Sequence, residues 1–125
     1  MIDLHLALRI HSILIKQYGG SAGVRDLNSV ESAINRPYST FGGNDLYPTV
    51  IEKAAAIAES IIKNHPFIDG NKRTGYALML LTLMDQNIDI LVGEDAKYDF
   101  VIQIASGQLD FNEIVIWIKQ NCTYM

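Results

Sequence analysis

The segment from Arg73 to Asp85 constrains the fold more than any other part of the chain, because apolar side chains surround it on nearly every side if it is helical. A helix of this kind must be buried among other elements. Residues 50–64 precede it and predict another strong helix, since the run is rich in alanine and its apolar positions recur at helical spacing. We therefore expect an all-α protein built around one buried helix.

Capping signals and helix breakers delimit the remaining elements. Gly19 and Gly20 end a first helix that carries its apolar residues on one face. A capping box at 28–31 predicts a short second helix that ends near Arg36, because Pro37 follows. A second capping box at 49–52 opens the alanine-rich helix. Residues 88–92 predict an extended connection, and two more helices are expected at 95–105 and 111–121. The predicted fold class is a single-domain bundle of about six helices spanning residues 1–125.

Composition narrows the class of protein. The hydrophobic share of 49% and the charged share of 19% are typical of a globular domain. The net charge of −4 argues against direct nucleic-acid binding, and the most apolar stretch, Tyr76 to Met84, is too short to cross a membrane. Cys122 is the only cysteine, so an internal disulfide is excluded and a reducing compartment is favoured. We expect a cytoplasmic protein without a membrane partner.

Residues 37–47 do not fit the helical pattern. Tyr38, Phe41 and Tyr47 flank the turn-rich sequence Gly-Gly-Asn-Asp at 42–45. Turn residues between β-capable flanks predict a hairpin or flap just before the alanine-rich helix. A loop of this length is often functional.

The nine residues from His65 to Arg73 predict an anion site. They connect the two strongest helices, and unpaired N–H groups together with the helix dipole favour negative charge where the second of these helices begins. Gly70 allows the backbone to curl closely around a ligand, while Asn71, Lys72 and Arg73 add side-chain donors and two positive charges. These features suit a phosphate better than a carboxylate.

Asp69 and His65 indicate more than passive binding of an anion. A carboxylate beside a phosphate site is repulsive unless a divalent cation lies between them, and Mg²⁺ held by one carboxylate and phosphate oxygens is usual in nucleotide sites. Histidine is the side chain that most often serves as a general base, so His65 is a candidate for that role. The residues alone leave two interpretations open: a phosphoryl- or nucleotidyl-transfer site, and a non-catalytic helical module that binds an anion or a partner.

Other residues carry weaker signals. The chain contains no P-loop, because no glycine stands at the required offset before a Gly-Lys-Ser/Thr. His5 and His11 lie six positions apart and do not share a helix face, so we expect core or boundary positions rather than metal ligands. Cys122 is expected to be an unreactive thiol, and Trp117 to serve packing.

The sequence His65-Pro-Phe-Ile-Asp-Gly-Asn-Lys-Arg73 resembles the motif of the Fic/Doc family, His-x-Phe-x-Asp/Glu-Gly/Ala-Asn-Gly/Lys-Arg, at every defined position. Chain length, the position of the motif, Tyr18-Gly-Gly and the flap are similar to the death-on-curing (Doc) toxin branch. The resemblance implies the Fic/Doc fold and ATP as a substrate with Mg²⁺. It implies that His65 is the general base, that Asp69 holds the metal, and that Phe67 anchors the loop. It further implies phosphate binding by Asn71 and Arg73.

The resemblance also implies a target and a regulator. Family flaps pin the target peptide as an added strand, which would give Tyr38, Phe41 and Tyr47 a docking role. Members of the Doc branch act on the translation machinery, with elongation factor Tu as the target that the resemblance suggests. Self-restrained family members resemble one another in a Ser/Thr-x-x-x-Glu-Gly/Asn helix, and none of the glutamates here stands in that pattern. We therefore expect a separate antitoxin protein to restrain this chain.

Two positions separate the branches of the family. Lys72 stands where adenylyl-transferring members carry glycine, and Tyr76 stands where many carry a second arginine. Lysine at this position resembles the Doc branch, whose members are similar to kinases. Transfer of the γ-phosphate of ATP to a protein hydroxyl is therefore the first expectation, and adenylyl transfer is the alternative.

Overall fold

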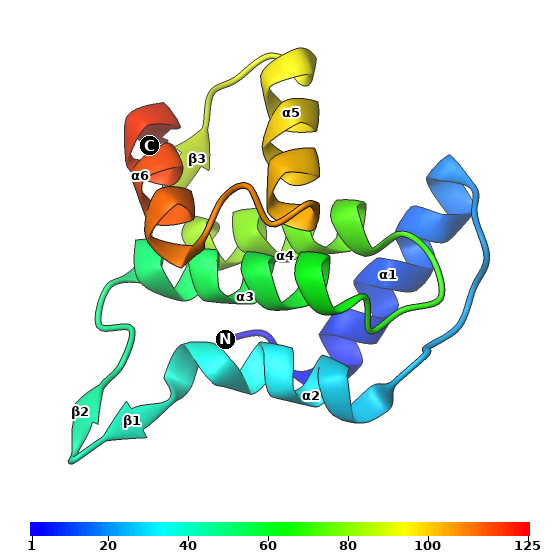
Figure 1. The fold of residues 1–125 in the computed structure, drawn as a ribbon, viewed down its shortest axis with the longest axis horizontal. Coiled ribbons are helices and arrows are strands. Elements are labelled where there is room, and N and C mark those ends of the chain that lie inside the picture. The colour runs from blue at the N-terminus through cyan, green and yellow to red at the C-terminus, as the bar shows by residue number, and fades with distance from the viewer.

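A computed structural model describes all residues from 1 to 125, and most of them lie in helices. Its six α-helices are α1 (Leu4–Tyr18), α2 (Leu27–Asn35), α3 (Val50–Asn64), α4 (Asn71–Met84), α5 (Glu94–Ala105) and α6 (Phe111–Asn121). A short 3₁₀ turn, η1 (Arg36–Tyr38), follows α2. Four short strands complete the fold: β1 (Thr40–Phe41), β2 (Asn44–Asp45), β3 (Ile88–Ile90) and β4 (Cys122–Tyr124). The predicted all-α bundle of about six helices is confirmed (Figure 1).

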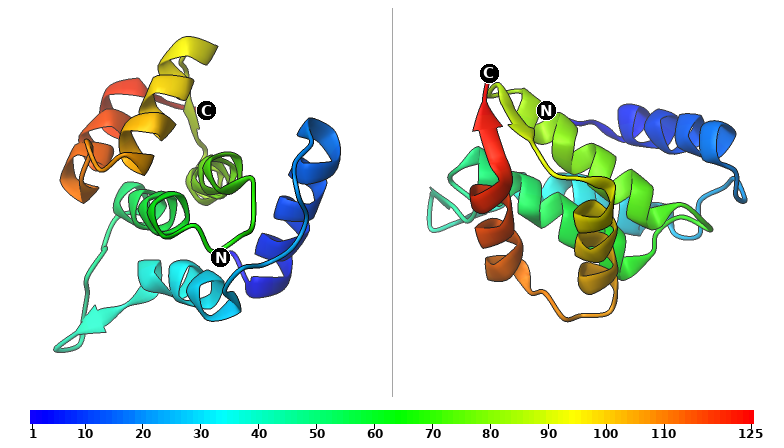
Figure 2. Two further views of the ribbon diagram at one scale, coloured as in Figure 1. Left: turned by 45° about the vertical axis from the view of Figure 1, so that its right-hand side comes forward. Right: turned by 90° about the horizontal axis from the view of Figure 1, so that it is seen from above.

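The helices form three layers, with α3 and α4 side by side in the middle one (Figure 2). One hydrophobic core lies between this central pair and α5 and α6, and it contains Phe100, Ile104, Ile114 and Ile118. A second core lies on the other side, between the central pair and α1 and α2. The expectation of one buried central helix is therefore only half correct, because α3 shares the centre with α4.

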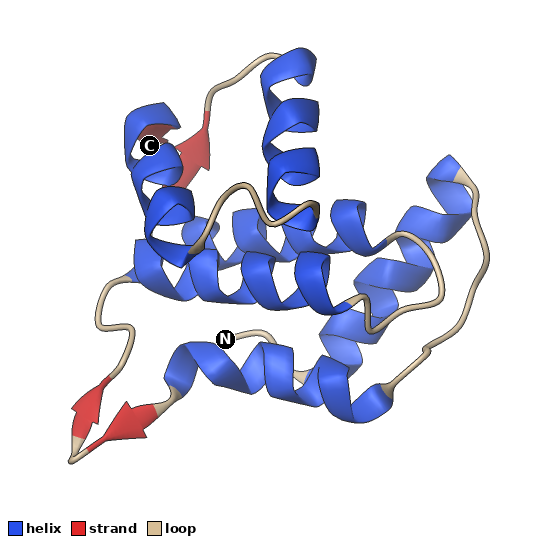
Figure 3. Cartoon of the chain, in the orientation of Figure 1, coloured by secondary structure: helices blue, strands red, loops and turns tan.

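The strands form two small antiparallel pairs at the edges of the bundle (Figure 3). β1 and β2 make the predicted hairpin, turning at Gly42 and Gly43. β3 pairs with β4, which follows α6 directly. The sequence analysis identified 88–92 as extended but missed β4, because three residues after a helix carry no pattern of their own.

Local side-chain bonds set where the helices begin. Asp110 and Glu113 form a reciprocal capping box at the start of α6. At the start of α3, the Thr49 hydroxyl accepts from the Glu52 N–H, as the predicted box at 49–52 requires. The predicted box at 28–31 is wrong, because α2 begins earlier and the carboxylate of Asp26 caps it by accepting from the Ser29 N–H. The structure contains no helix long and apolar enough to span a membrane.

Close approach of α3 and α4 depends on Gly75. A Cβ atom at this position would lie 2.6 Å from Cγ1 of Ile62 and 3.3 Å from Cγ2 of Ile61, and both isoleucines are fully buried on α3. A larger residue must therefore push the two central helices apart, and this pair also holds the loop that connects them.

We expect Gly75→Val to lower the free energy of unfolding by at least about 2 kcal/mol, since the overpacking cost exceeds the small gain in helix propensity. Urea denaturation followed by circular dichroism measures the change. Gly93→Val is the control for an added side chain, because a Cβ there meets nothing within 4 Å and φ is −73°. Gly93 is the N-cap of α5, so this variant should lose no more than about 1 kcal/mol. Equal stability of the two variants would contradict this account of the packing.

Candidate active site

The six-residue loop between α3 and α4 begins and ends with left-handed backbone. His65, the residue after α3, has φ 49° and ψ 57°, and Gly70, the N-cap of α4, has φ 76°. The loop borders a cavity of about 690 Å³. Six predicted site residues line this cavity together: His65, Asp69, Gly70, Asn71, Lys72 and Arg73.

Two buried side chains hold the middle of the loop. Phe67 is 1% exposed and lies in the core between α1, α2 and the central helices, which is the anchoring position that the resemblance implied. Asn71 is also buried, and its amide bonds to Phe67 twice: Oδ1 accepts from the Phe67 N–H at 2.9 Å, and Nδ2 donates to the Phe67 carbonyl at 3.0 Å. The side chain predicted to bind phosphate thus has a structural role that the sequence did not reveal. One hydrogen of Nδ2 remains for a ligand.

His11 on α1 fixes the far end of the loop. Its ring is buried and stacks on Phe67 with centroids 3.9 Å apart, and its Nε2 lies 2.8 Å from the carbonyl oxygen of Asp69. A carbonyl only accepts, so Nε2 carries the hydrogen and donates it. The expectation of a core position for His11 is confirmed, yet the residue also orients the backbone of Asp69. Sequence analysis missed this contact because 58 positions separate the two residues.

Asp69 presents an exposed carboxylate that backbone groups hold in place. Oδ2 accepts from the Ser21 N–H at 3.1 Å and Oδ1 from the Gly70 N–H at 2.8 Å. These two hydrogen bonds lower the pKa of Asp69 below its usual value, and the bond from Ser21 has the larger effect. Gly20 makes the approach possible, because a Cβ there would lie 2.7 Å from Oδ2. The Gly-Gly sequence that ends α1 therefore also makes room for this carboxylate.

Asp69 fits a metal ligand of the kind that shares its cation with a phosphate. Each carboxylate oxygen uses one lone pair on a backbone N–H and has others available, and the low pKa keeps the group ionised. No cluster of three or more His, Cys, Asp or Glu residues exists that could hold a metal alone. Mg²⁺ commonly binds through one or two carboxylates, water and substrate phosphates, so a phosphate ligand would have to complete the site.

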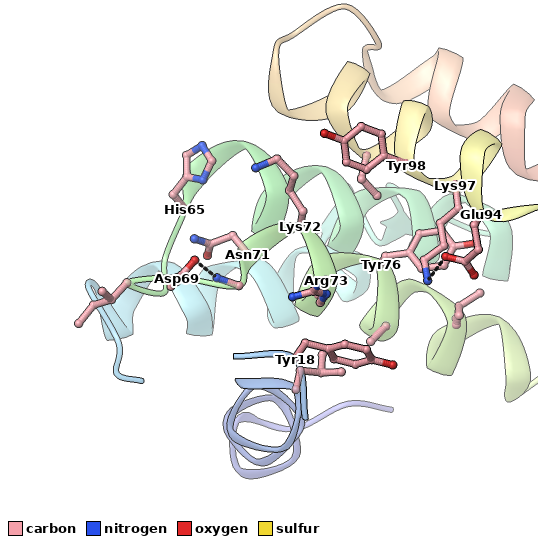
Figure 4. A pocket seen from close by; sticks show the side chains of 16 residues that line it. Tyr18, His65, Asp69, Asn71, Lys72, Arg73, Tyr76, Glu94, Lys97 and Tyr98 are labelled. Atoms are coloured by element: carbon pink, nitrogen blue, oxygen red, sulfur yellow. Dashed lines mark hydrogen bonds and ion pairs between the residues drawn. The ribbon is translucent and has the colours of Figure 1, made fainter. Parts of the chain in front are cut away.

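The positive charges line the middle of the cavity. Lys72 and Arg73 are exposed in the first turn of α4, where unpaired backbone N–H groups and the helix dipole also favour an anion. The Arg73 guanidinium lies over the ring of Tyr18, 4.5 Å from its centroid, so the last residue of α1 supports it. His65 and Asp69 lie at one end of the cavity and Tyr76 at the other, with Arg73 between them (Figure 4).

The end of the cavity near Tyr76 is built by α4 and α5 together. Apolar and aromatic side chains line it: Tyr76, Leu80, Tyr98 and Val101. Lys97 lies over the ring of Tyr76 at 5.1 Å and contacts Glu94 at 3.9 Å. Burial, and then the charges of Asp89 and Glu94, raise the pKa of Tyr76 to about 12, so its hydroxyl stays protonated at neutral pH. No pattern in the sequence indicated that α5 contributes to this site, because the spacing of apolar residues in a helix does not show which element it packs against.

The flap lies away from this cavity. Tyr47 packs edge-on against Phe111 at 5.1 Å, Tyr38 lies near the Lys53 ammonium, and Phe41 is 79% exposed near the hairpin tip. None of the three lines the cavity, since the flap precedes the start of α3 whereas His65 follows its end. The 15 residues of α3 separate the two ends, a length of about 22 Å. The docking role of the flap therefore stays a prediction.

Comparison with known proteins gives two matches. The model of a family described as the Fic/DOC family matches residues 1–83, which include all of α1 to α3, the loop and nearly all of α4. Toxin Doc of Mycolicibacterium smegmatis is 33% identical over 99 residues, which cover 78% of this chain and 76% of that protein.

We expect Asn71→Ala to lower the free energy of unfolding by about 2 kcal/mol, because it leaves the buried N–H and carbonyl of Phe67 without their partner. Urea denaturation measures the loss. Asn112→Ala, on the exposed face of α6, is the control and should change the value by less than about 0.5 kcal/mol. A stability of Asn71→Ala equal to that of the control would contradict the role assigned to this amide.

Proposed function

The chain belongs to the Fic/DOC family, and we propose that it is a Doc-like toxin that transfers the γ-phosphate of ATP to a Ser or Thr hydroxyl of a protein target. The observation that carries this proposal is the placement of Asp69 in one cavity with His65, Lys72 and Arg73. A carboxylate beside two cations suits a metal-bound nucleotide, whereas a site for a bare phosphate gains nothing from it.

The cavity suits a nucleotide along its length. Its volume of about 690 Å³ lies within the usual range for small-molecule sites. The phosphates would lie against the first turn of α4, where Arg73 can donate two parallel hydrogen bonds and Lys72 adds a second charge. Asp69 would hold Mg²⁺, which neutralises phosphate charge when it is bound.

His65 would perform the proton chemistry. Its exposed imidazole stands at the cavity, where a hydroxyl of a docked target can reach it. The ring would take the hydroxyl proton while the oxygen forms a bond to the γ-phosphorus, and the bond from that phosphorus to the β–γ bridging oxygen would break. The products would be ADP and a phosphorylated protein.

Lys72 favours the kinase reaction over adenylyl transfer. Its side chain projects from the first turn of α4 toward the cavity, in space that glycine would leave for phosphates (Figure 4). Tyr76 offers a buried ring where many adenylyl transferases carry a second arginine. Adenylyl transfer to a protein hydroxyl remains the alternative, because the same base, metal ligand and anion site would serve it.

A toxin role follows from the relative named Toxin Doc, and it implies partners. We propose elongation factor Tu in the cytoplasm as the target, and a small, partly disordered antitoxin that orders on binding as the regulator. An antitoxin helix on an apolar groove is a common mode of such binding.

The position of the label that is transferred tests the reaction. With a susceptible target, wild type should transfer radioactivity from γ-labelled ATP and none from α-labelled ATP. His65→Ala should fold normally and lose about a hundred- to ten-thousandfold in rate, because it lacks the base. Transfer from α-labelled ATP would replace the kinase assignment with adenylyl transfer, and full activity of a folded His65→Ala protein would overturn the mechanism.

Expression in a bacterium that lacks the antitoxin tests the biological role. Wild type should arrest growth, because an unrestrained enzyme would inactivate an essential protein. His65→Ala at the same level of expression should leave growth unchanged. Normal growth in cells that contain active wild-type enzyme would contradict the toxin role and leave the transferase activity standing.

A further inference from the structure

The segment from Gly23 to Asp26, between α1 and α2, runs antiparallel beside the loop. Val24 forms a β-bridge with Phe67, and the Ile68 N–H donates to the carbonyl of Gly23 at 3.1 Å. The carbonyl of Pro66 accepts from the N–H groups of Arg25 at 2.8 Å and Asp26 at 3.0 Å. This segment therefore holds the backbone of the loop from Pro66 to Ile68.

The side chain of Arg25 extends this grip to the end of α3. Its Nε donates to the carbonyl of His65 and its Nη2 to the carbonyl of Asn64, each at 2.6 Å. Carbonyls at the end of a helix lack partners within the helix, and the dipole makes this end negative. A guanidinium fork matches two neighbouring acceptors better than any other side chain.

These two bonds act on the residue whose side chain must face the cavity. His65 is a non-glycine residue at φ 49°, a left-handed conformation that costs about 1–2 kcal/mol. Such backbone persists only where its surroundings enforce it. If His65 relaxed to helical dihedrals it would continue α3, and its side chain would turn by about 100° around the helix axis relative to that of Asn64.

We propose that Arg25 is a positioning residue for His65. Its two hydrogen bonds keep His65 in the left-handed conformation, which aims the imidazole into the cavity. This inference rests on the proposed function only in that His65 is taken as the base. Arg25 lies outside the cavity lining and reaches His65 only through its backbone. Removing it should therefore affect the chemical step and leave nucleotide binding to α4 unchanged.

The test compares Arg25→Met with Arg25→Lys and Arg9→Met. Arg25→Met should lower kcat by about a hundredfold, the loss typical of a misplaced catalytic group, and change KM for ATP less than about threefold. Arg25→Lys retains the charge and one donor and should recover part of kcat. Arg9→Met removes an exposed arginine of α1 and should match wild type.

Amide exchange and relaxation by NMR give a readout that needs no activity. In Arg25→Met, the backbone amides of His65 and Phe67 should show increased motion, whereas the amides of α5 and α6 should behave as they do in wild type. Unchanged kcat in Arg25→Met, or a parallel loss of kcat and ATP affinity with loosening of the whole domain, would overturn the inference. Absence of any transfer by wild type would instead reject the proposed function, and the NMR comparison would still decide the role of Arg25.

Discussion

Hydrogen bonding to the backbone of residues 64–69 is the constraint on which the rest of the site depends. This stretch runs from the last residue of α3 into the loop before α4, so most of its peptide groups have no partners within a helix. The carbonyls of Asn64, His65, Pro66, Phe67 and Asp69 each accept a hydrogen bond, and the N–H groups of Phe67 and Ile68 each donate one. The partners come from α1, from the 23–26 segment and from α4, so three parts of the chain hold the loop.

Two of the side chains that hold the backbone of the loop are buried, whereas the charged side chains in the first turn of α4 are exposed. The buried groups, the Asn71 amide and the His11 ring, bond to the backbone of the loop. Groups that face the cavity, such as Lys72 and Arg73, are exposed and keep their donors for a ligand. A loop fixed by its backbone can present charged side chains without reorganisation, which is the condition for electrostatic stabilisation of a transition state. Asp69 lines the same cavity as Lys72 and Arg73, and its carboxylate accepts from the N–H groups of Ser21 and Gly70.

The sequence revealed the elements and the motif because both depend on neighbours in the chain. Capping residues and apolar spacing predicted all six helices to within a few residues. The loop placed its charged residues together because they are adjacent in the chain. The contacts of His11 with Asp69 and of Arg25 with His65 join residues 58 and 40 positions apart, and no local pattern reports them. The start of α2 was misplaced for a local reason: Asp26 and Asn28 are both residue types that cap helices, and it is the Asp26 carboxylate that accepts from the Ser29 N–H.

Amide hydrogen exchange at the loop tests the central claim most directly, because the claim is that this irregular segment is held as firmly as the helices around it. The amides of Phe67 and Ile68 should exchange as slowly as those in the middle of α3, while the amide of Gly43 in the exposed hairpin turn should exchange rapidly. Exchange of Phe67 and Ile68 at the rate of Gly43 would show that the loop opens freely, and it would contradict the account.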